Sequence, residues 1–302
     1  MASEHVDATK NTCITFPIIY PDSNNDLVFV SGGYFGIGSN EGYPEETPVR
    51  QKKVNDFYIS NHEVTNGDFL AFVEATGYVT QAEKGAIIET GQTSSLETGA
   101  AVFQTPTNGG TGWSLAENAD WRAPNGDGRV PDDWLRLPVV NIAFEDAKNY
   151  ALWLGRDLPT EAEWEYAAKK AKVNDSHLGD RAPVSSANIW QGLFPVVDSG
   201  RDGHKGLAKV GCYPADELGL YDMIGNVWEW TQSSYFPRHD TVPNPRSGFD
   251  PAQPGVAVKT IKGGSYLCAR NWCQRYRASS RHPQDITLGT NHIGFRTVKR
   301  TQ

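Results

Sequence analysis

Glycine and proline recur so often in this chain that long regular elements have little room. Of the 302 residues, 30 are glycine and 18 are proline, or about one residue in six. Proline disrupts a helix from within, and glycine favours turns over regular structure. The sequence therefore predicts short elements joined by loops and turns, and argues against a helical bundle or a coiled coil. With 9 Trp, 12 Tyr and 12 Phe, the chain has enough apolar surface to form a core rather than stay disordered.

Charge and hydropathy argue against two classes of partner. The formal net charge is −8 at pH 7, so the chain has no surplus of positive charge to neutralise a run of phosphates, and we expect no nucleic-acid partner. No stretch approaches the roughly 18 apolar residues of a membrane span, and we expect no membrane partner. Residues 1–10 are polar and include acids, and Pro17 interrupts the apolar run that follows, so we do not interpret the N-terminus as a secretory signal.

Four cysteines are too few for a disulfide framework in a chain of this length. They occupy positions 13, 212, 268 and 273, and we expect all four to be reduced thiols. Cys268 and Cys273 are five residues apart, which would point them away from each other on a strand or on a helix. They can meet only if the chain turns between them.

Two converged thiols could be ordinary buried cysteines, a redox disulfide or a two-coordinate site for Cu(I). Spacing alone favours ordinary buried cysteines. Zinc would need four ligands, and the positions of His282 and His292 match no familiar zinc finger. The residues by themselves leave these alternatives open.

Three helices can be predicted from their ends and their apolar faces. Thr65 is expected to cap a helix that ends at Gly77. A second helix has apolar residues at helical spacing between 147 and 154 and ends at Gly155. A third begins at Thr160, which forms a capping box with Glu163.

The remaining sequence indicates one domain preceded by a short arm. We assign residues 1–26 to an N-terminal arm and residues 27–302 to a single domain. Residues 85–135 are rich in Gly, Thr, Asn and Asp and are interpreted as a long polar loop, of the kind that is usually functional or ordered by packing. After residue 170 we expect short strands and turns without a helix.

Two later segments, 188–204 and 222–229, suit hard cations. Both interleave carboxylates and amides with glycines, which is typical of oxygen-rich calcium sites but also of ordinary turns. Within the second segment Trp228 and Trp230 flank Glu229. On a strand both tryptophans would face the same side, either in the core or in the wall of an aromatic pocket.

Taken together, the motifs resemble those of the formylglycine-generating enzymes, also called sulfatase-modifying factors, over about residues 27–298. The most discriminating stretch is Gly-Gly-Ser-Tyr-Leu-Cys-x4-Cys-x-Arg-Tyr-Arg at residues 263–277. Further shared motifs are Asn-His-Glu-Val-Thr-Asn at 61–66, Leu-Pro-Thr-Glu-Ala-Glu-Trp-Glu at 158–165, Gly-Asn-Val-Trp-Glu-Trp at 225–230 and Gly-Phe-Arg at 294–296.

The resemblance implies both a fold and an activity. The expected fold is a single α+β domain with little regular secondary structure, of the C-type-lectin-like kind. The expected enzyme oxidises a cysteine in a Cys-x-Pro-x-Arg motif of a sulfatase to Cα-formylglycine, using O₂ and Cu(I). Its partners would be a sulfatase polypeptide, or a peptide with that motif, and O₂.

The resemblance also implies roles for individual residues. Cys268 and Cys273 match the copper ligands, Ser265 matches a serine near the oxygen site, and Trp228 matches a pocket tryptophan. Trp272 and Arg277 are expected to contact the substrate. One structural calcium site is matched by Asn188, Ile189, Asp202 and His204, and a second by Asp222, Gly225, Val227 and Glu229.

The chain also departs from the family pattern. Residue 272 is Trp where the family usually has Tyr, and the loop 281–292 differs from the usual one. The extra cysteines of secreted relatives are absent, which favours a bacterial, cytoplasmic protein. The changed loop keeps open an oxidase of the same fold that acts on a different thiol. A non-catalytic binding module stabilised by calcium is the remaining alternative.

Overall fold

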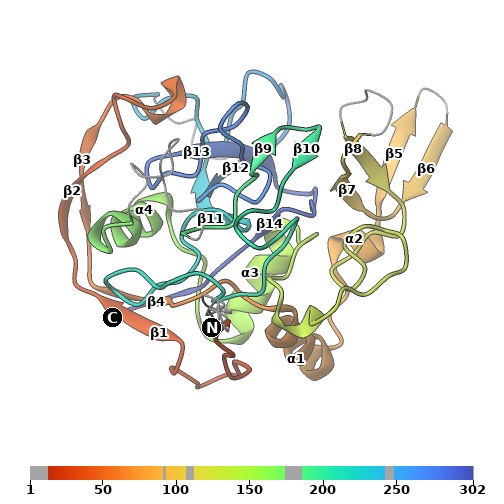
Figure 1. Cartoon of the computed structure of the whole chain (residues 1–302), viewed down its shortest axis with the longest axis horizontal. Coiled ribbons are helices and arrows are strands. Elements are labelled where there is room, and N and C mark those ends of the chain that lie inside the picture. The colour runs from red at the N-terminus through yellow and green to blue at the C-terminus, as the bar shows by residue number, and fades with distance from the viewer. Residues whose placement is uncertain (1–12, 91–92, 107–111, 174–185, 242–247, 302) are drawn as a thin grey trace, which may run out of the picture.

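A four-stranded sheet lies at the centre of the molecule (Figure 1). The computed structural model describes residues 13–90, 93–106, 112–173, 186–241 and 248–301. The central strands run in the order β13–β12–β11–β14, antiparallel except for the parallel pair β11–β14. Their bounds are β11 Trp228–Ser234, β12 Val258–Lys262, β13 Arg281–Asp285 and β14 Ile293–Gly294.

The two faces of this sheet have different chemistry. The register sets Glu229 opposite Lys262, and both side chains contact helix α4 (Glu161–Lys170). Trp230 lies opposite Ile261 on the other face, because successive side chains alternate. Trp228, two residues earlier, shares that second face, so the prediction that both tryptophans face one side is confirmed.

A second sheet, β1–β4–β15, brings the two ends of the domain together, because the first and the last strand both pair with β4. Four two-stranded hairpins complete the strands, and Figure 1 shows β5–β6 and β7–β8 on the side of the molecule away from β2–β3. The bounds are β1 Leu27–Val30, β4 Phe57–Ser60, β15 Val298–Arg300, β2 Gly33–Ile37, β3 Arg50–Val54, β5 Ala86–Thr90, β6 Thr93–Glu97, β7 Ala100–Phe103, β8 Trp113–Ala116, β9 Gly192–Leu193 and β10 Val197–Asp198.

The three predicted helices are confirmed, together with their caps. Thr65 accepts a hydrogen bond from the backbone of Asp68, and Gly77 ends the helix with φ of 67°. Thr160 and Glu163 form the predicted capping box. The helices are α1 Asn66–Thr76, α2 Gln81–Lys84, α3 Phe144–Trp153 and α4, with the 3₁₀ turns η1 Pro44–Glu46 and η2 Trp134–Arg136. No helix follows α4 in the described part of the chain, as expected.

The interpretation of residues 85–135 as one polar loop is wrong. Strands β5 to β8 and the turn η2 lie in this region, and the short helix α2 just before it was not predicted. Strand β8 is only 4 residues long and all but its last residue are exposed, so burial of an apolar face does not account for it. Its pairing with β7 orders it instead.

Two large apolar clusters form most of the core of the described residues, and three smaller clusters accompany them. The larger of the two packs α1 and α3 against the second face of the central sheet and includes Cys268 at its edge. The other packs α4 against the sheet β1–β4–β15. Trp121, Trp164 and Trp230 are fully buried, and such large side chains contribute most to the burial of apolar surface.

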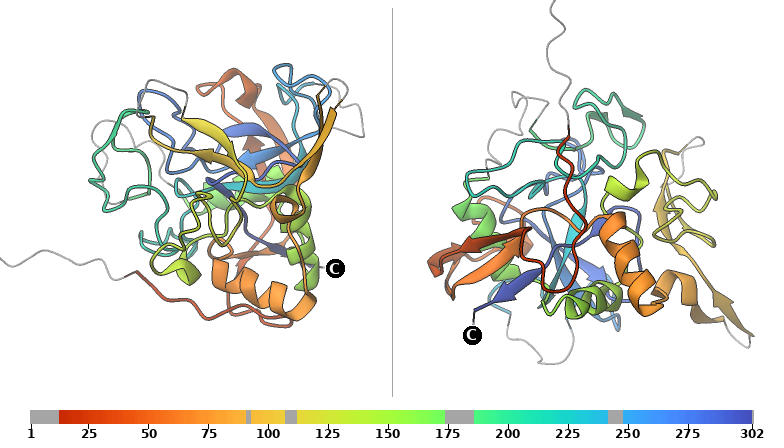
Figure 2. Two further views of the ribbon diagram at one scale, coloured as in Figure 1. Left: turned by 90° about the vertical axis from the view of Figure 1, so that its right-hand side faces the viewer. Right: turned by 90° about the horizontal axis from the view of Figure 1, so that it is seen from below.

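The segment before β1 packs on the domain from Cys13 onward, along the outside of the molecule (Figure 2). A disulfide joins Cys13 to Cys212, and Ile14 donates a backbone hydrogen bond to Gly211. Ile19 is buried in the larger core cluster.

The expectation of four reduced thiols is therefore wrong for Cys13 and Cys212. They are 199 residues apart, and only the packing of the arm brings them together. Disulfides are rare in cytosolic proteins, so this bridge weighs against the expected cytoplasmic location. No helix in the described ranges is long and apolar enough to cross a bilayer.

Breaking this disulfide should destabilise the fold. In Cys13→Ser we expect the free energy of unfolding to fall by about 2–4 kcal/mol, because a long closed loop is released in the unfolded chain. Urea denaturation without reductant measures the change. Adding reductant should lower the stability of the wild type and leave that of the variant unchanged. Equal stability of both proteins without reductant would show that the bridge does not form.

Candidate active site

The loop between β12 and β13 turns so that its two thiols meet. Gly263 and Gly264 have φ of 96° and 77°, a region that favours glycine, and they redirect the chain after β12. The backbone of Cys268 donates to Ser265 O, and that of Cys273 donates to Ala269 O. These turns place Cys268 Sγ 2.9 Å from Cys273 Sγ. The turn that the spacing required is present.

The two thiols differ in exposure and in acidity. Burial raises the pKa of Cys268 well above its usual value. The hydrogen bond from Cys268 lowers the pKa of Cys273 to about 7, and Arg275 supports this shift through its backbone and its guanidinium. Cys273 is also the more exposed of the two. The pair therefore presents one easily ionised thiol in front of one deeply buried thiol.

Both thiols line a cavity of about 580 Å³. Its walls combine aromatic and polar side chains, and they include residues from β8, β11, β13 and the segment after β9. Trp272 stands at the mouth with 69% of its surface exposed and stacks on Phe194 at 5.8 Å between ring centroids. Other lining residues are Trp113, Trp228, Gln253, Ile261, Ser265, Arg275, His282, Gln284, Asp285 and His292. The cavity is thus open to a chain that could bring a thiol to the pair.

Two histidines and Ser265 are among the polar residues that line the cavity. Ser265 Oγ lies 3.1 Å from His292 Nδ1, and the backbone of Leu267 also donates to Ser265 Oγ. His282 Nδ1 lies 2.8 Å from the Pro283 carbonyl, so it carries a proton and donates. Burial lowers the pKa of both imidazoles, for His292 to about 3. Both are neutral near pH 7.

The residues matched to the first calcium site lie close together. The backbone amides of Ile189 and His204 both donate to the carboxylate of Asp202, each at 3.2 Å. Asn188 directly precedes Ile189 and is buried. Burial and the nearby Asp198 raise the pKa of Asp202. A cation here would offset the crowding of negative charge.

The second calcium segment faces a carboxylate that the sequence analysis missed. Burial raises the pKa of Glu63 well above its usual value, and the neighbouring Asp222 and Glu229 add to this effect. Glu63 Oε1 has no hydrogen-bond partner. Arg296 pairs with Glu229 at 2.7 Å and supplies one positive charge for the three acids. An unpaired oxygen among buried acids fits a bound cation.

The backbone links the two segments. The Cα of Gly225 packs so tightly against the carbonyl of Asn188 that no side chain would fit, and Val227 is buried beside the start of β14. In the described residues, no three His, Cys, Asp or Glu side chains form a ready-made metal centre. Any calcium site would therefore draw on backbone carbonyl and amide oxygens as well.

Comparison with known proteins identifies the family. The model of the sulfatase-modifying factor enzyme 1-like domain matches residues 19–301. The chain belongs to the sulfatase-modifying factor family. This membership confirms the resemblance found in the sequence.

Relatives of the family include both active and inactive members. The formylglycine-generating enzyme of Mycobacterium tuberculosis is 42% identical over 90% of this chain and 97% of its own. That of Thermomonospora curvata is 36% identical over 89% of this chain and 92% of its own. The inactive Cα-formylglycine-generating enzyme 2 of Mus musculus is still 32% identical over 89% of this chain and 84% of its own. Overall sequence identity therefore does not decide whether a member of the family is active. The residues of the site must decide it.

Solved structures confirm the expected fold. PvdO from Pseudomonas aeruginosa superposes with a TM-score of 0.63 at 22% identity, over 91% of this chain and 94% of its own. CarF superposes with a TM-score of 0.53 at 21% identity, over 92% and 98%. The single mixed α+β domain with few helices is thus the fold of this family member.

Arg277 is not among the residues that line the cavity, and its expected contact with substrate stays a prediction. Its guanidinium pairs with Glu46 of η1, which is fully buried. Arg275, two residues earlier, lines the cavity instead and pairs with Glu45 at 2.7 Å. In this chain Arg277 therefore pairs with a buried carboxylate, whereas Arg275 lines the cavity. The spacing of the motif alone could not show this difference.

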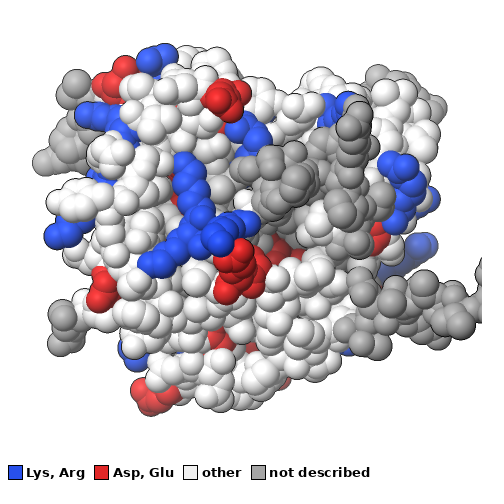
Figure 3. Space-filling model, turned by 60° about the vertical axis from the view of Figure 1, so that its left-hand side comes forward, with Lys and Arg blue, Asp and Glu red and all other residues white. Residues whose placement is uncertain are grey.

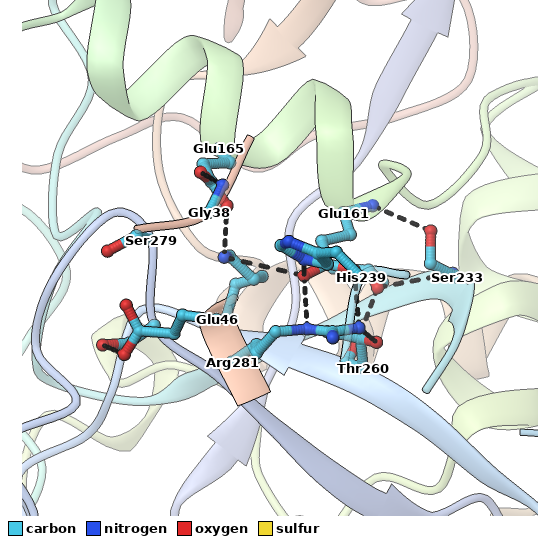
Figure 4. A network of polar contacts seen from close by, with 12 residues as sticks. Gly38, Glu46, Glu161, Glu165, Ser233, His239, Thr260, Ser279 and Arg281 are labelled. Carbon is cyan, nitrogen blue, oxygen red and sulfur yellow. Dashed lines mark hydrogen bonds and ion pairs between the residues drawn. The ribbon is translucent and has the colours of Figure 1, made fainter. Parts of the chain in front are cut away.

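A buried charged network joins helix α4 to the central sheet (Figure 4). Arg281 on β13 pairs with Glu161 of α4 at 2.7 Å, and Lys262 on β12 donates to Glu165 at 2.8 Å. Burial opposes ionisation of Glu161, but Arg281, His239 and Lys262 together outweigh it and hold the pKa of Glu161 well below its usual range. Buried charges persist only when paired, so this network fixes β12 and β13 against α4.

Arg277 and Trp272 should respond differently to substitution. In Arg277→Met we expect the free energy of unfolding to fall by about 3 kcal/mol, because Glu46 is left buried without its partner. The exposed Trp272→Ala should change stability by less than about 0.5 kcal/mol. Denaturant titration of both variants tests this. A fully stable Arg277→Met would argue against this structural role and favour the expected contact with substrate.

Proposed function

We propose that this chain generates formylglycine by oxidising a peptidyl cysteine of a sulfatase. One observation carries the proposal: two thiols 2.9 Å apart lie in a cavity whose mouth is open. The relatives named formylglycine-generating enzyme support it.

The stoichiometry of the reaction determines which reactants must enter the cavity. Conversion of a cysteine CH₂–SH to an aldehyde with release of H₂S, while O₂ is reduced, consumes one O₂, two electrons and two protons and also yields one water. A thiol reductant would supply the electrons. The protons must enter through polar groups, and Ser265 and His292 are among the polar residues of the wall.

The thiol pair suits Cu(I). Two sulfur ligands are typical for this soft ion, and a thiol with a pKa of about 7 loses its proton readily to a metal. Cys268 and Cys273 would hold the ion. Bound Cu(I) would supply a redox-active centre that takes the substrate thiolate and transfers electrons to O₂. Trp228 and Trp113 would exclude bulk water beside it.

The entrance of the cavity and one of its lining residues suit an extended peptide. Trp272 and Phe194 offer apolar surface at the entrance. Asp285 is the single carboxylate in the described lining and offers a counter-charge to the arginine of Cys-x-Pro-x-Arg. Asp285 is the last residue of β13, so the first part of the segment 281–292 is a strand rather than the expected loop. The sequence of this segment differs from the usual family pattern.

A peptide assay tests the proposal. With Cu(I), O₂ and a thiol reductant, we expect a Cys-x-Pro-x-Arg peptide to gain an aldehyde that hydrazide captures. Cys268→Ser and Cys273→Ser should lose at least about 100-fold in rate, because each removes one of two ligands. Absence of product with copper bound would end the proposal.

The peptide sequence separates the alternatives. Replacing the peptide arginine by alanine should raise KM by about tenfold or more, since one charge-assisted contact is lost. Equal turnover of peptides without the proline and the arginine would favour an oxidase of another thiol. Full biological activity of Cys273→Ala would favour a non-catalytic binding module.

We also propose two structural calcium ions. The grouping around Asp202 and the unpaired Oε1 of Glu63 support them. Calorimetry should find two Ca²⁺ per chain in the wild type and one in each of Asp202→Asn and Glu63→Gln. Saturating Ca²⁺ at about 100 times Kd should stabilise the fold by about 2.7 kcal/mol for each occupied site. No heat and no change in Tm would contradict this.

A further inference from the structure

Ser265 occupies an unusual position in the cavity, since its hydroxyl has two nitrogen neighbours. Leu267 donates its backbone N–H to Ser265 Oγ at 3.2 Å. His292 Nδ1 approaches the same oxygen at 3.1 Å. The residue is fully buried, yet it lines the cavity that holds the thiols. Cys268 is bonded through its own N–H to the Ser265 carbonyl, so the hydroxyl and the thiol pair belong to one turn.

The state of His292 decides where the hydroxyl proton points. Burial and the nearby His282 lower the pKa of His292 to about 3, so the ring is neutral and carries one proton. A hydroxyl oxygen has two lone pairs and one proton. If Nδ1 carries the proton, Leu267 N–H and His292 Nδ1–H occupy both lone pairs. The Ser265 proton then has only the remaining direction, away from both donors.

The surroundings hold the imidazole in place. The ring of Trp113 on β8 lies 5.0 Å from that of His292, edge to face. The other cavity histidine, His282, donates from Nδ1 to the Pro283 carbonyl, so its contacts differ from those of His292. His292 lies directly before β14, and its carbonyl accepts from Trp228 N at 2.9 Å. The backbone thereby ties His292 to the strand that bears Trp228.

We propose that His292 is a positioning residue that donates from Nδ1–H to Ser265 and aims the serine hydroxyl at the oxygen being reduced. The inference rests on the proposed function. Ser265 O–H breaks, its proton passes to that oxygen, and one of the two protons of the reaction is delivered. The serine oxygen is left negative, and Leu267 N–H and His292 Nδ1–H stabilise it as a pair of preorganised donors. A proton from solvent, relayed by water, then restores the Ser265 O–H, so the solvent is the net source of the proton.

A double-mutant cycle tests the coupling. We compare His292→Phe, which keeps an aromatic ring beside Trp113, with Ser265→Ala and with the double variant. Each single change should lower kcat roughly 100-fold, with KM changed less than about threefold. The double variant should be no slower than Ser265→Ala, because His292 acts only through the serine. Multiplied losses in the double variant, or a normal kcat in His292→Phe, would overturn the inference.

A conservative variant separates positioning from folding. His292→Asn keeps an N–H that can donate to Ser265 and should recover about tenfold of the lost kcat. All variants are first compared with the wild type in Tm and in Cu(I) binding. If His292→Phe does not fold, the comparison of His292→Asn with Ser265→Ala decides. A kcat in His292→Asn as low as in Ser265→Ala would then contradict positioning.

A spectroscopic test is independent of turnover. In ¹⁵N-histidine-labelled protein, the ¹⁵N shifts of His292 should be those of a neutral imidazole protonated at Nδ1, assigned by comparison with His292→Asn. A ring protonated at Nε2 would overturn the inference even in an active enzyme. Wild-type protein that binds Cu(I) but forms no aldehyde would instead end the proposed function, while the tautomer would still report on His292.

Discussion

Partly buried ion pairs hold the loop that carries Cys268 and Cys273 in position. Glu45 and Glu46 of η1 face the loop from a segment about 230 residues earlier and pair with Arg275 and Arg277. Arg281 extends the contact by donating to the Glu45 carbonyl. A buried charge without its partner costs several kcal/mol, so these groups hold each other in one arrangement. With both ends of the loop fixed, the two thiols are held on the same side.

The resulting cavity is lined by apolar side chains and by polar groups whose protonation states are defined. Cys268 is deep and resists ionisation, and Cys273 is shallow and ionises near neutral pH. Both cavity histidines are neutral, so their hydrogen bonds depend on tautomer rather than on charge. The charged surface lies elsewhere: on the face shown in Figure 3, basic and acidic side chains are interspersed, and the described residues form no broad basic surface there.

The sequence predicted the features that depend on neighbouring residues. Helix caps such as Thr65 and Thr160 are local, and so is the turn that brings Cys268 to Cys273. Features that depend on contacts between residues far apart in the sequence were either not predicted or predicted wrongly. The Cys13–Cys212 disulfide needs the arm to pack, and the burial of Glu63 beside Asp222 needs α1 and the later loop to meet. The motif at 61–66 held the one available signal for Glu63.

The proposed activity requires the two sulfurs of Cys268 and Cys273 to bind one soft ion together. Competition of the reduced protein with a chromophoric Cu(I) chelator measures this directly. We expect one Cu(I) per wild-type chain and at least about a 100-fold weaker Cu(I) affinity in Cys268→Ser. The Cu(I) affinity of Cys212→Ser should equal that of the wild type. Equal affinity in the wild type and in Cys268→Ser, or no Cu(I) in the wild type, would contradict joint binding by the two sulfurs.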